Sequence, residues 1–249
     1  MTRSLAFDRR RGLLVPSVLT TTGLIVLVGL GLWQLERKAW KEDLIAKLSD
    51  RLAAAPAALP TRETWPSLHA EDLEFRRVKF PAEFLHEQEA LVYAAASAFR
   101  PDVSGPGYWV FTPARVGGGS VVMVNRGFVP EDRKDATSRP EGQIAGTLEI
   151  TGIVRWPESR GWFTPADDPT RNLWFVRDHR AIAEGKSLEN IAPFYIEQEA
   201  PAPPGGLPRV ARLQVSLPNN HLQYALVWFA LALALAAVFV IWMRKRVRQ

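Results

Sequence analysis

The segment Leu217–Ala225, with the sequence LPNNHLQYA, contains residue types that can bind a metal or a cofactor. Pro218 and the two asparagines after it are typical of a helix start, with Asn219 or Asn220 as the expected cap. His221 then lies in the first turn, where the positive end of the helix dipole disfavours the imidazolium form. Neutral imidazole is the form that binds a metal ion. The pattern therefore places a candidate metal ligand at the head of a helix.

Aromatic residues follow this histidine at helical spacing. Tyr224, Ala225 and Trp228 come three, four and seven residues after His221, so that all four share one helix face. We expect the small Ala225 to leave a flat recess beside the imidazole. An axial histidine with aromatic neighbours suits haem iron. The alternative is a histidine that only anchors the helix end at the membrane interface.

Two uncharged runs must supply the helices that position this site. Residues 12–35 and 222–243 carry no charged side chain. Each run exceeds the roughly 20 residues that a membrane-spanning helix needs. Residues 12–35 also exceed the apolar core of a cleaved signal peptide, so we expect a retained anchor, with Pro16 in the first turn of its helix. The start of the chain lacks a long Arg/Ser-rich transit peptide, which favours a bacterial inner membrane over an organelle.

The charge distribution indicates the membrane topology of the chain rather than a nucleic-acid-binding surface. The formal net charge is +5. Eight basic residues and one acid lie in the two tails, which leaves 23 basic and 25 acidic residues in 36–221 and about −2 net charge there. Basic residues flank membrane helices on the cytoplasmic side. We therefore expect both termini in the cytoplasm, an extracytoplasmic central domain, and no nucleic-acid partner.

The expected organisation is a membrane protein in which two transmembrane α-helices flank a mainly antiparallel β (α+β) extracytoplasmic domain. The expected parts are a basic tail (1–11), the first membrane helix (12–35), the central domain (36–221), the second membrane helix (222–243, starting near 219–221) and a second basic tail (244–249). Within the domain we expect a helical extension (36–54), a β-rich core (67–199) and a Pro/Gly return segment (200–217).

Alternation of apolar and polar residues predicts the strands of the core. The expected strands are Val78–Leu85, Ala90–Ala95, Tyr108–Ala114, Ser120–Asn125, Thr147–Arg155, Leu173–Val176 and Phe194–Glu197. The glycines at 117–119 predict that Tyr108–Asn125 is a hairpin with a flexible loop. Asp178 is expected to cap a short helix over 179–184 that ends at Gly185.

Enzymatic chemistry finds little support. The chain has no cysteine, which excludes disulfides, thiol redox motifs and Cys-ligated metals. No phosphate-binding loop or nucleophile motif is present. A metal-dependent hydrolase would have to use His86, His179 and the pair Asp167 and Asp168, which are widely separated. We therefore expect a non-enzyme.

Five motifs, taken together, resemble the Surfeit locus protein 1 family (the Shy-type proteins). They are GLWQLERKAWK (31–41), GPGYWVFTP (105–113), VVMVNRGFVP (121–130), FTPADDPTRNLWFVRD (163–178) and PNNHLQYALVWF (218–229). The resemblance covers essentially the whole chain. One departure is Val227, where the family commonly has threonine, and it removes a hydroxyl from the second helix.

The resemblance implies a chaperone-like factor for the biogenesis of the respiratory chain. As implied by this resemblance, the family consists of assembly factors for cytochrome c oxidase that help haem A enter, or remain in, oxidase subunit I, and its bacterial members are similar to haem A-binding proteins. It also implies that His221 corresponds to the family's haem-linked histidine. Oxidase subunit I, haem A synthase and the lipid bilayer are the implied partners. The alternative is a cofactor-free scaffold whose domain binds an immature oxidase subunit and whose helices pack against the membrane core of that subunit, with small residues such as Ala230 and Ala234 as the packing surface.

Basic side chains are candidates to complete a haem site, because propionates are anionic. Arg37 and Lys41 follow the first membrane helix, and Trp33 and Gln34 precede them as possible neighbours of the macrocycle. Arg126 is expected to face the membrane from the domain. The alternatives are ordinary lipid headgroup contacts for Arg37 and Lys41, and a turn anchored through backbone carbonyls for Arg126.

Overall fold

The computed structural model describes residues 2–94, 105–210 and 219–248, with side chains from residue 13 onward. The last residue of the expected strand Ala90–Ala95 and the part of the return segment 200–217 from residue 211 lie outside the described residues. The chain divides into two compact units. One unit joins Met1–Lys47 to Leu217–Gln249, and the other is the domain Leu48–Ser216.

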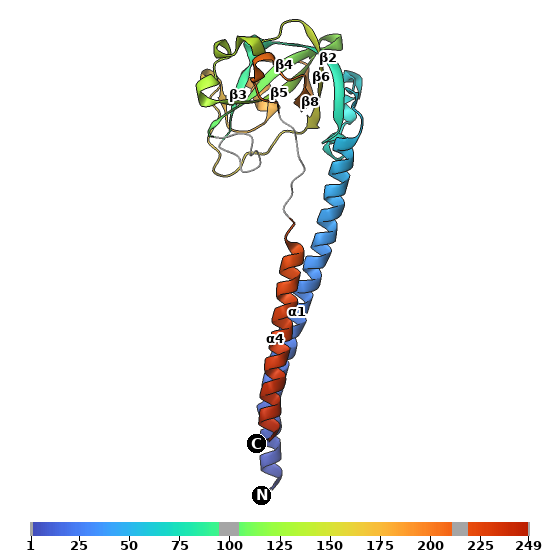
Figure 1. Cartoon of the computed structure of the whole chain (residues 1–249), viewed down its shortest axis with the longest axis vertical. Helices are drawn as coiled ribbons and strands as arrows, with labels where there is room; N and C mark the ends of the chain where they lie inside the picture. The colour runs from blue at the N-terminus through green and yellow to red at the C-terminus, as the bar shows by residue number, and fades with distance from the viewer. Residues whose placement is uncertain (1, 95–104, 211–218, 249) are drawn as a thin grey trace. The chain divides into compact units, whose positions relative to one another are not determined.

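The first unit consists of two long helices. Helix α1 (Thr2–Ala53) and helix α4 (His221–Arg248) lie side by side and run antiparallel (Figure 1). The described part of α1 from Leu13 and the whole of α4 are long and apolar enough to cross a membrane. The chain is therefore a two-span membrane protein with a strand-rich domain between the spans, as its composition predicts.

One end of each helix differs from the expected one, namely the start of α1 and the end of α4. Helix α1 begins at Thr2, so Pro16 lies inside the helix and our placement of Pro16 in the first turn is wrong. Residues 2–11 contain neither glycine nor proline and include four arginines, a good helix former. Helix α4 likewise continues past the expected tail boundary to Arg248. Charge composition marks where a helix leaves the apolar layer, but not where it ends.

Small residues bring the two helices together. A Cβ on Gly31 would overlap the ring of Phe229, and a Cβ on Gly23 would lie 3.0 Å from Leu235 Cδ2. On α4, Ala225 and Ala232 are buried. Their seven-residue separation is the spacing expected where one helix packs along another. The glycines of α1 therefore serve helix contact within the chain.

The domain is built from short strands and minor helices. Its strands are β1 (Ala57–Ala58), β2 (Arg77–Phe84), β3 (Ala90–Ala94), β4 (Gly107–Val116), β5 (Ser120–Pro130), β6 (Thr147–Arg155), β7 (Leu173–Trp174) and β8 (Ile191–Ala200). Its α-helices, besides the end of α1, are α2 (Ala70–Leu73) and α3 (His179–Gly185). Its 3-10 helices are η1 (Arg62–Ser67), η2 (His86–Gln88), η3 (Gly117–Gly119), η4 (Glu131–Arg133), η5 (Ala136–Ser138), η6 (Pro140–Gly142), η7 (Pro169–Arg171) and η8 (Pro204–Gly206).

The sheet closes on itself. Its order is β1-β2-β6-β8-β5-β4-β3-β7, and a further pairing joins β2 to β4 through Glu83 opposite Arg115 and Phe84 opposite Ala114. Strands β2, β6, β8, β5 and β4 thus form a closed ring, with β3 and β7 as an extension. Most pairs are antiparallel, and the parallel pairs are β1–β2, β3–β7 and β5–β8.

Two apolar clusters occupy the two faces of the ring strands. Alternate residues of β2, namely Val78, Phe80, Ala82 and Phe84, point into the first cluster. Strands β4 and β5 are buried along most of their length, because their other face belongs to a second cluster that includes Phe111, Met123 and Trp174. Helix α3 packs on that second face through Ile182.

The strand predictions are largely confirmed. Strand β6 has the expected ends, and β4 and β5 pair as the expected hairpin through η3. Asp178 caps α3 by accepting hydrogen bonds from Arg180 N and Ala181 N. Strand β7 is shorter than expected, and β1 and the ring closure were not predicted, because they depend on partners distant in the sequence.

Candidate functional site

His221 is the first residue of α4 and touches α1. Its Nδ1 lies 2.7 Å from Oε1 of Gln34, which is 187 residues away in the sequence. The backbone carbonyl of Asn220 accepts a hydrogen bond from Tyr224 N, so the helix starts where the proline and asparagines predict. Of the two expected caps, Asn220 stands at the cap position directly before the helix, whereas the side-chain oxygen of Asn219 has no partner among the described residues.

The contact with Gln34 determines which ring nitrogen of His221 can bind a ligand. The amide oxygen is an acceptor, so Nδ1 donates the hydrogen bond, and in the neutral imidazole the lone pair is then on Nε2. Within the described parts of the chain, no hydrogen bond to Nε2 is formed. An imidazole held through Nδ1–H by a neighbouring carbonyl is the usual arrangement of a metal-ligating histidine.

The aromatic residues of α4 differ in their exposure. Tyr224 is 56% exposed, whereas Trp228 is half-buried on the same face as His221. Ala225 is fully buried, so the recess that we expected beside the imidazole is not there. That side of the helix is filled where α4 packs, whereas the side of Tyr224 is open.

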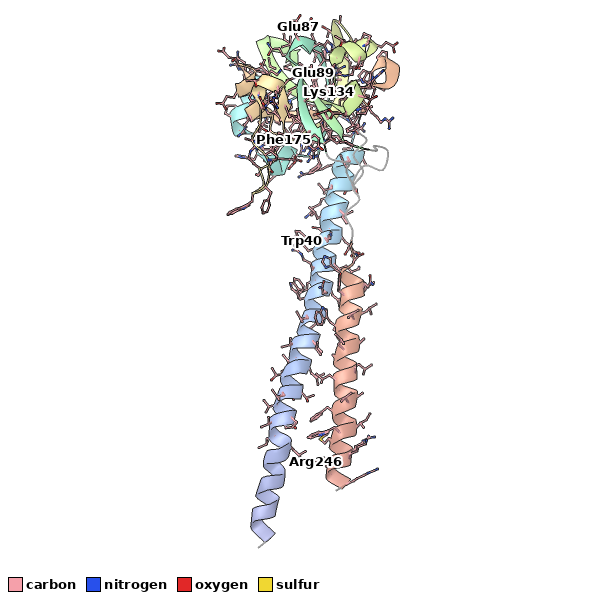
Figure 2. All side chains as sticks on the ribbon, turned by 90° about the vertical axis from the view of Figure 1, so that its left-hand side faces the viewer. Trp40, Glu87, Glu89, Lys134, Phe175 and Arg246 are labelled. Atoms are coloured by element: carbon pink, nitrogen blue, oxygen red, sulfur yellow. The ribbon has the colours of Figure 1, made fainter. Side chains whose placement is uncertain are left out.

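Two basic residues of α1 follow Gln34 at helical spacing. Arg37 and Lys41 come three and seven residues after it, about 4.5 and 10.5 Å further along the axis. The guanidinium of Arg37 lies 4.0 Å from the ring centroid of Trp40, a side chain that projects from α1 (Figure 2). Lys41 also has an interaction partner. Both cations therefore lie on the part of α1 just beyond the contact with His221.

The antiparallel packing places residues of the two helices on a common side. Antiparallel helices are related by a two-fold axis, so residues three positions after the contact on each helix turn to the same side of the pair. Tyr224 follows His221 by three, and Arg37 follows Gln34 by three. One side of the helix pair thus presents an aromatic ring, an imidazole and a guanidinium in succession along its length.

Arg126 does not belong to this site. We expected it to face the membrane, but its side chain is 1% exposed inside the domain. The guanidinium donates to the carbonyl of Gly142, lies 3.3 Å from Nδ1 of His86 and stacks over Phe84. The alternative expectation, a turn anchored through a backbone carbonyl, describes its contact. The burial lowers the pKa of Arg126 to about 10.

The neighbours of Arg126 form a buried charge cluster that sequence reasoning missed. Glu89, labelled within the domain in Figure 2, binds Arg139 through both carboxylate oxygens and lies 3.8 Å from Nη1 of Arg126. Both arginines are almost completely buried. Burial also lowers the pKa of His86, whose Nε2 contacts the carbonyl of Ile144 at 2.8 Å. No sequence pattern links these residues, since they come from separate loops and strands.

The neighbouring glycine of the Asn-Arg-Gly motif has a backbone role. Gly127 has a φ of 121°, and a Cβ there would overlap the carbonyl of Arg209. Phe128 and Arg209 exchange both backbone hydrogen bonds at 2.9 and 2.8 Å. The motif therefore lets the return segment pair with β5.

The hydrolase alternative finds no support in the geometry. His179 is buried and contacts the carbonyl of Ala192, whereas His86 belongs to the charge cluster. Asp167 accepts a hydrogen bond from Phe175 N, and Asp168 caps η7. Among the described residues, no group of three or more histidine, cysteine or acidic side chains could hold a metal ion.

Comparison with known proteins shows similarity along nearly the whole chain. A family model described as SURF1 family matches residues 22–233. A SURF1-like protein of Monosiga brevicollis is 37% identical over 229 residues, which cover 89% of this chain and 85% of the relative. Surfeit locus protein 1 of Rattus norvegicus is 34% identical over 231 residues, covering 89% and 72% of the two chains. Surfeit locus protein 1 of Homo sapiens is 33% identical over 235 residues, covering 90% and 75%.

Proposed function

Since this chain belongs to the SURF1 family, we propose that it is a non-enzymatic assembly factor for a haem-copper oxidase such as cytochrome c oxidase. In this proposal it holds haem A as cargo at the head of α4 and helps to deliver it to, or stabilise it in, oxidase subunit I. Haem A synthase is the proposed donor. The observation that carries the proposal is the imidazole of His221, oriented by Gln34 with Nε2 available.

The described side chains at this site fit a haem. His221 Nε2 would bind the haem iron, and Gln34 would hold the imidazole in the tautomer that leaves Nε2 unprotonated. Tyr224 and Trp228 offer apolar ring faces to the macrocycle. Arg37 and Lys41 lie towards the polar edge of the apolar run, where they would pair with the anionic propionates. The bound haem supplies the redox-active iron that the client oxidase requires.

The test is a reduced-minus-oxidised spectrum of the full-length protein, purified in detergent from cells that also make haem A. His221→Ala is expected to lose the haem signal while it remains folded. His69→Ala is the matched control, because His69 is exposed and lies in the domain. It is expected to retain the parent's haem content. Haem retained by His221→Ala would overturn the assignment of the ligand.

A cofactor-free scaffold is the competing function. Ala230 and Ala234 are exposed on α4 and are therefore available for close contact with a partner helix, whereas Ala232 is already buried within the chain. If parent and His221→Ala both lack haem, and oxidase subunits still co-purify with both, the scaffold function replaces the haem function.

We also propose that the membrane is a bacterial inner membrane, with both termini cytoplasmic and the domain extracytoplasmic. The basic residues after α4 support this orientation. The chain has no cysteine, so single cysteines can be labelled without background. A membrane-impermeant maleimide added to intact cells is expected to label Thr137→Cys in the domain but not Ser4→Cys in the tail. The reverse labelling pattern would show that the protein has the opposite orientation in the membrane.

A further inference from the structure

The loop between β6 and β7 presents two large aromatic side chains to solvent. Trp162 and Phe163 are each 101% exposed, so neither ring packs against any described part of the domain. Residues 156–168, between β6 and η7, form neither helix nor strand, and stretches of about this length are uncommon in compact domains and often functional. Two adjacent and fully exposed aromatic rings form an apolar protrusion, a feature that can mark an interaction site.

The loop holds the aromatic tip in a defined conformation. Thr164 closes the turn, because Gly161 N donates to its Oγ1 at 3.1 Å and Thr164 N donates to the carbonyl of Gly161 at 3.2 Å. Arg160 ties the two sides of the loop together by binding Asp167 and the carbonyl of Pro165. Because the turn is already ordered, presenting the rings to a partner costs little conformational entropy.

The charges of the loop are compensated locally. Asp167 pairs with Arg160, and the carboxylate of Asp168 lies 3.4 Å from Nε of Arg171. Neither aspartate therefore remains as an unpaired negative charge near the tip. Arg171 is itself 82% exposed and can face anionic headgroups. This charge pattern is compatible with the surface of a bilayer that contains acidic lipids.

We propose that the aromatic tip, Trp162 and Phe163, inserts into the headgroup and acyl boundary of the bilayer that α1 and α4 span. Tryptophan and phenylalanine are typical residues of interfacial anchors. The domain is covalently joined to both membrane spans, so that even a two-residue anchor acts at a raised effective concentration of bilayer.

A lipid surface fits the tip better than a protein partner does. A stable protein interface needs roughly 800 Å² per partner and a complementary shape. The apolar surface of the tip is not extended by its neighbours in the sequence. These are Arg160 and Gly161 on one side and Thr164 on the other. A bilayer accepts a protruding apolar tip without any complementary pocket.

Photo-crosslinking in native membranes identifies the occupant directly. The probe is Phe163→p-benzoylphenylalanine in the full-length chain, which keeps an aromatic ring at the tip. After irradiation, mass spectrometry is expected to find phospholipid adducts at residue 163. The matched control places the same probe at Thr137, which is exposed in η5. The control is expected to give several-fold fewer lipid adducts.

A second variant tests the contribution of the neighbouring ring. Trp162→Ser in the same probe background is expected to lower the yield of lipid adducts several-fold, with an unchanged thermal unfolding midpoint because Trp162 makes no packing contact. Adducts to a protein instead of lipid would overturn the proposal in favour of a docking site. A lipid yield at residue 163 no higher than at residue 137 would also overturn it.

The same purified protein in vesicles of phosphatidylcholine and phosphatidylglycerol provides an independent check. Lipid adducts at residue 163 are expected there without any other protein present. Their absence from vesicles, with adducts in native membranes only, would show that another component brings the loop to the lipid and would overturn the proposal. The haem spectrum of His221→Ala does not enter this test, so the two proposals can fail separately.

Discussion

At the scale of single residues, the pair His221 and Gln34 is the most informative contact. It joins the start of α4 to α1 through one hydrogen bond of 2.7 Å. The bond selects the tautomer of the imidazole and limits the rotation of its ring. Gln34 is therefore a positioning residue, whereas His221 is the proposed ligand.

Gln34→Leu is expected to lower the affinity for haem about 10- to 100-fold, the usual effect of removing the partner of a metal-ligating histidine. The measurement is a haem titration of the purified protein followed by absorbance. Gln223→Leu is the matched control, because Gln223 is exposed on α4. Equal affinities of the two variants would contradict the positioning role. A change in the absorption maximum of the Gln34 variant would further separate an altered ligand from simple unfolding.

Glu89 is important for the stability of the domain, because its carboxylate compensates the charge of two buried guanidinium groups. Glu89→Leu leaves Arg139 and Arg126 without their counter-charge and is expected to lower the free energy of unfolding of the domain by about 3–5 kcal/mol. This change in unfolding free energy is measured by denaturant titration of the full-length protein in detergent, with near-ultraviolet circular dichroism as the signal. Glu149→Leu removes the exposed ion pair with Lys79 and should cost less than about 1 kcal/mol. A similar loss of unfolding free energy in both variants would show that the buried charge cluster contributes no more to stability than an exposed ion pair.

At the scale of elements, the packing of α1 against α4 supports the site. The two helices approach closely at Gly31, opposite Phe229. Gly31 lies one turn from Gln34 on α1, so a displacement of the helices there also affects the contact with His221. Helix packing and the geometry of the proposed ligand His221 are therefore coupled.

Gly31→Val is expected to destabilise the helix pair by about 1–3 kcal/mol through overpacking and to reduce haem retention. Gly29→Val is the matched control, since a Cβ at Gly29 meets no atom within 4 Å. Thermal unfolding and haem content in detergent report the two effects. Phe229→Ala in the Gly31→Val background should restore part of the loss. If Gly29→Val proves equally harmful, the effect comes from valine in a helix rather than from the contact.

At the scale of the whole molecule, buried histidines make the stability of the domain depend on pH. Burial lowers the pKa of His179 to about 4 and also lowers the pKa of His86. Unfolded histidine has a pKa near 6.5, so below that value protons bind the unfolded state preferentially. The stability that these neutral histidines contribute is therefore present above about pH 6.5 and is lost as the pH falls.

For His179 the loss is expected to amount to about 3 kcal/mol between pH 6.5 and pH 4. Denaturant titrations of the parent at several pH values measure the slope. His179→Gln is expected to be less stable at pH 8, because it changes a buried ring that contacts the carbonyl of Ala192, but to show a shallower loss on acidification. An unchanged slope in this variant would assign the pH dependence to other groups.

The sequence by itself determined the two membrane spans, most of the strands, the helix start at His221 and the resemblance to a family. These properties depend on local composition and spacing, such as the uncharged run 222–243 or the cap of Asp178 on α3. Only the tertiary structure decided the closure of β2 on β4, the partner of His221 and the burial of Arg126 and Ala225. Each of these depends on contacts between residues distant in the sequence. Residue type alone did not separate Arg37, on an exposed helix, from Arg126, inside the domain, because burial is set by the packing around a side chain.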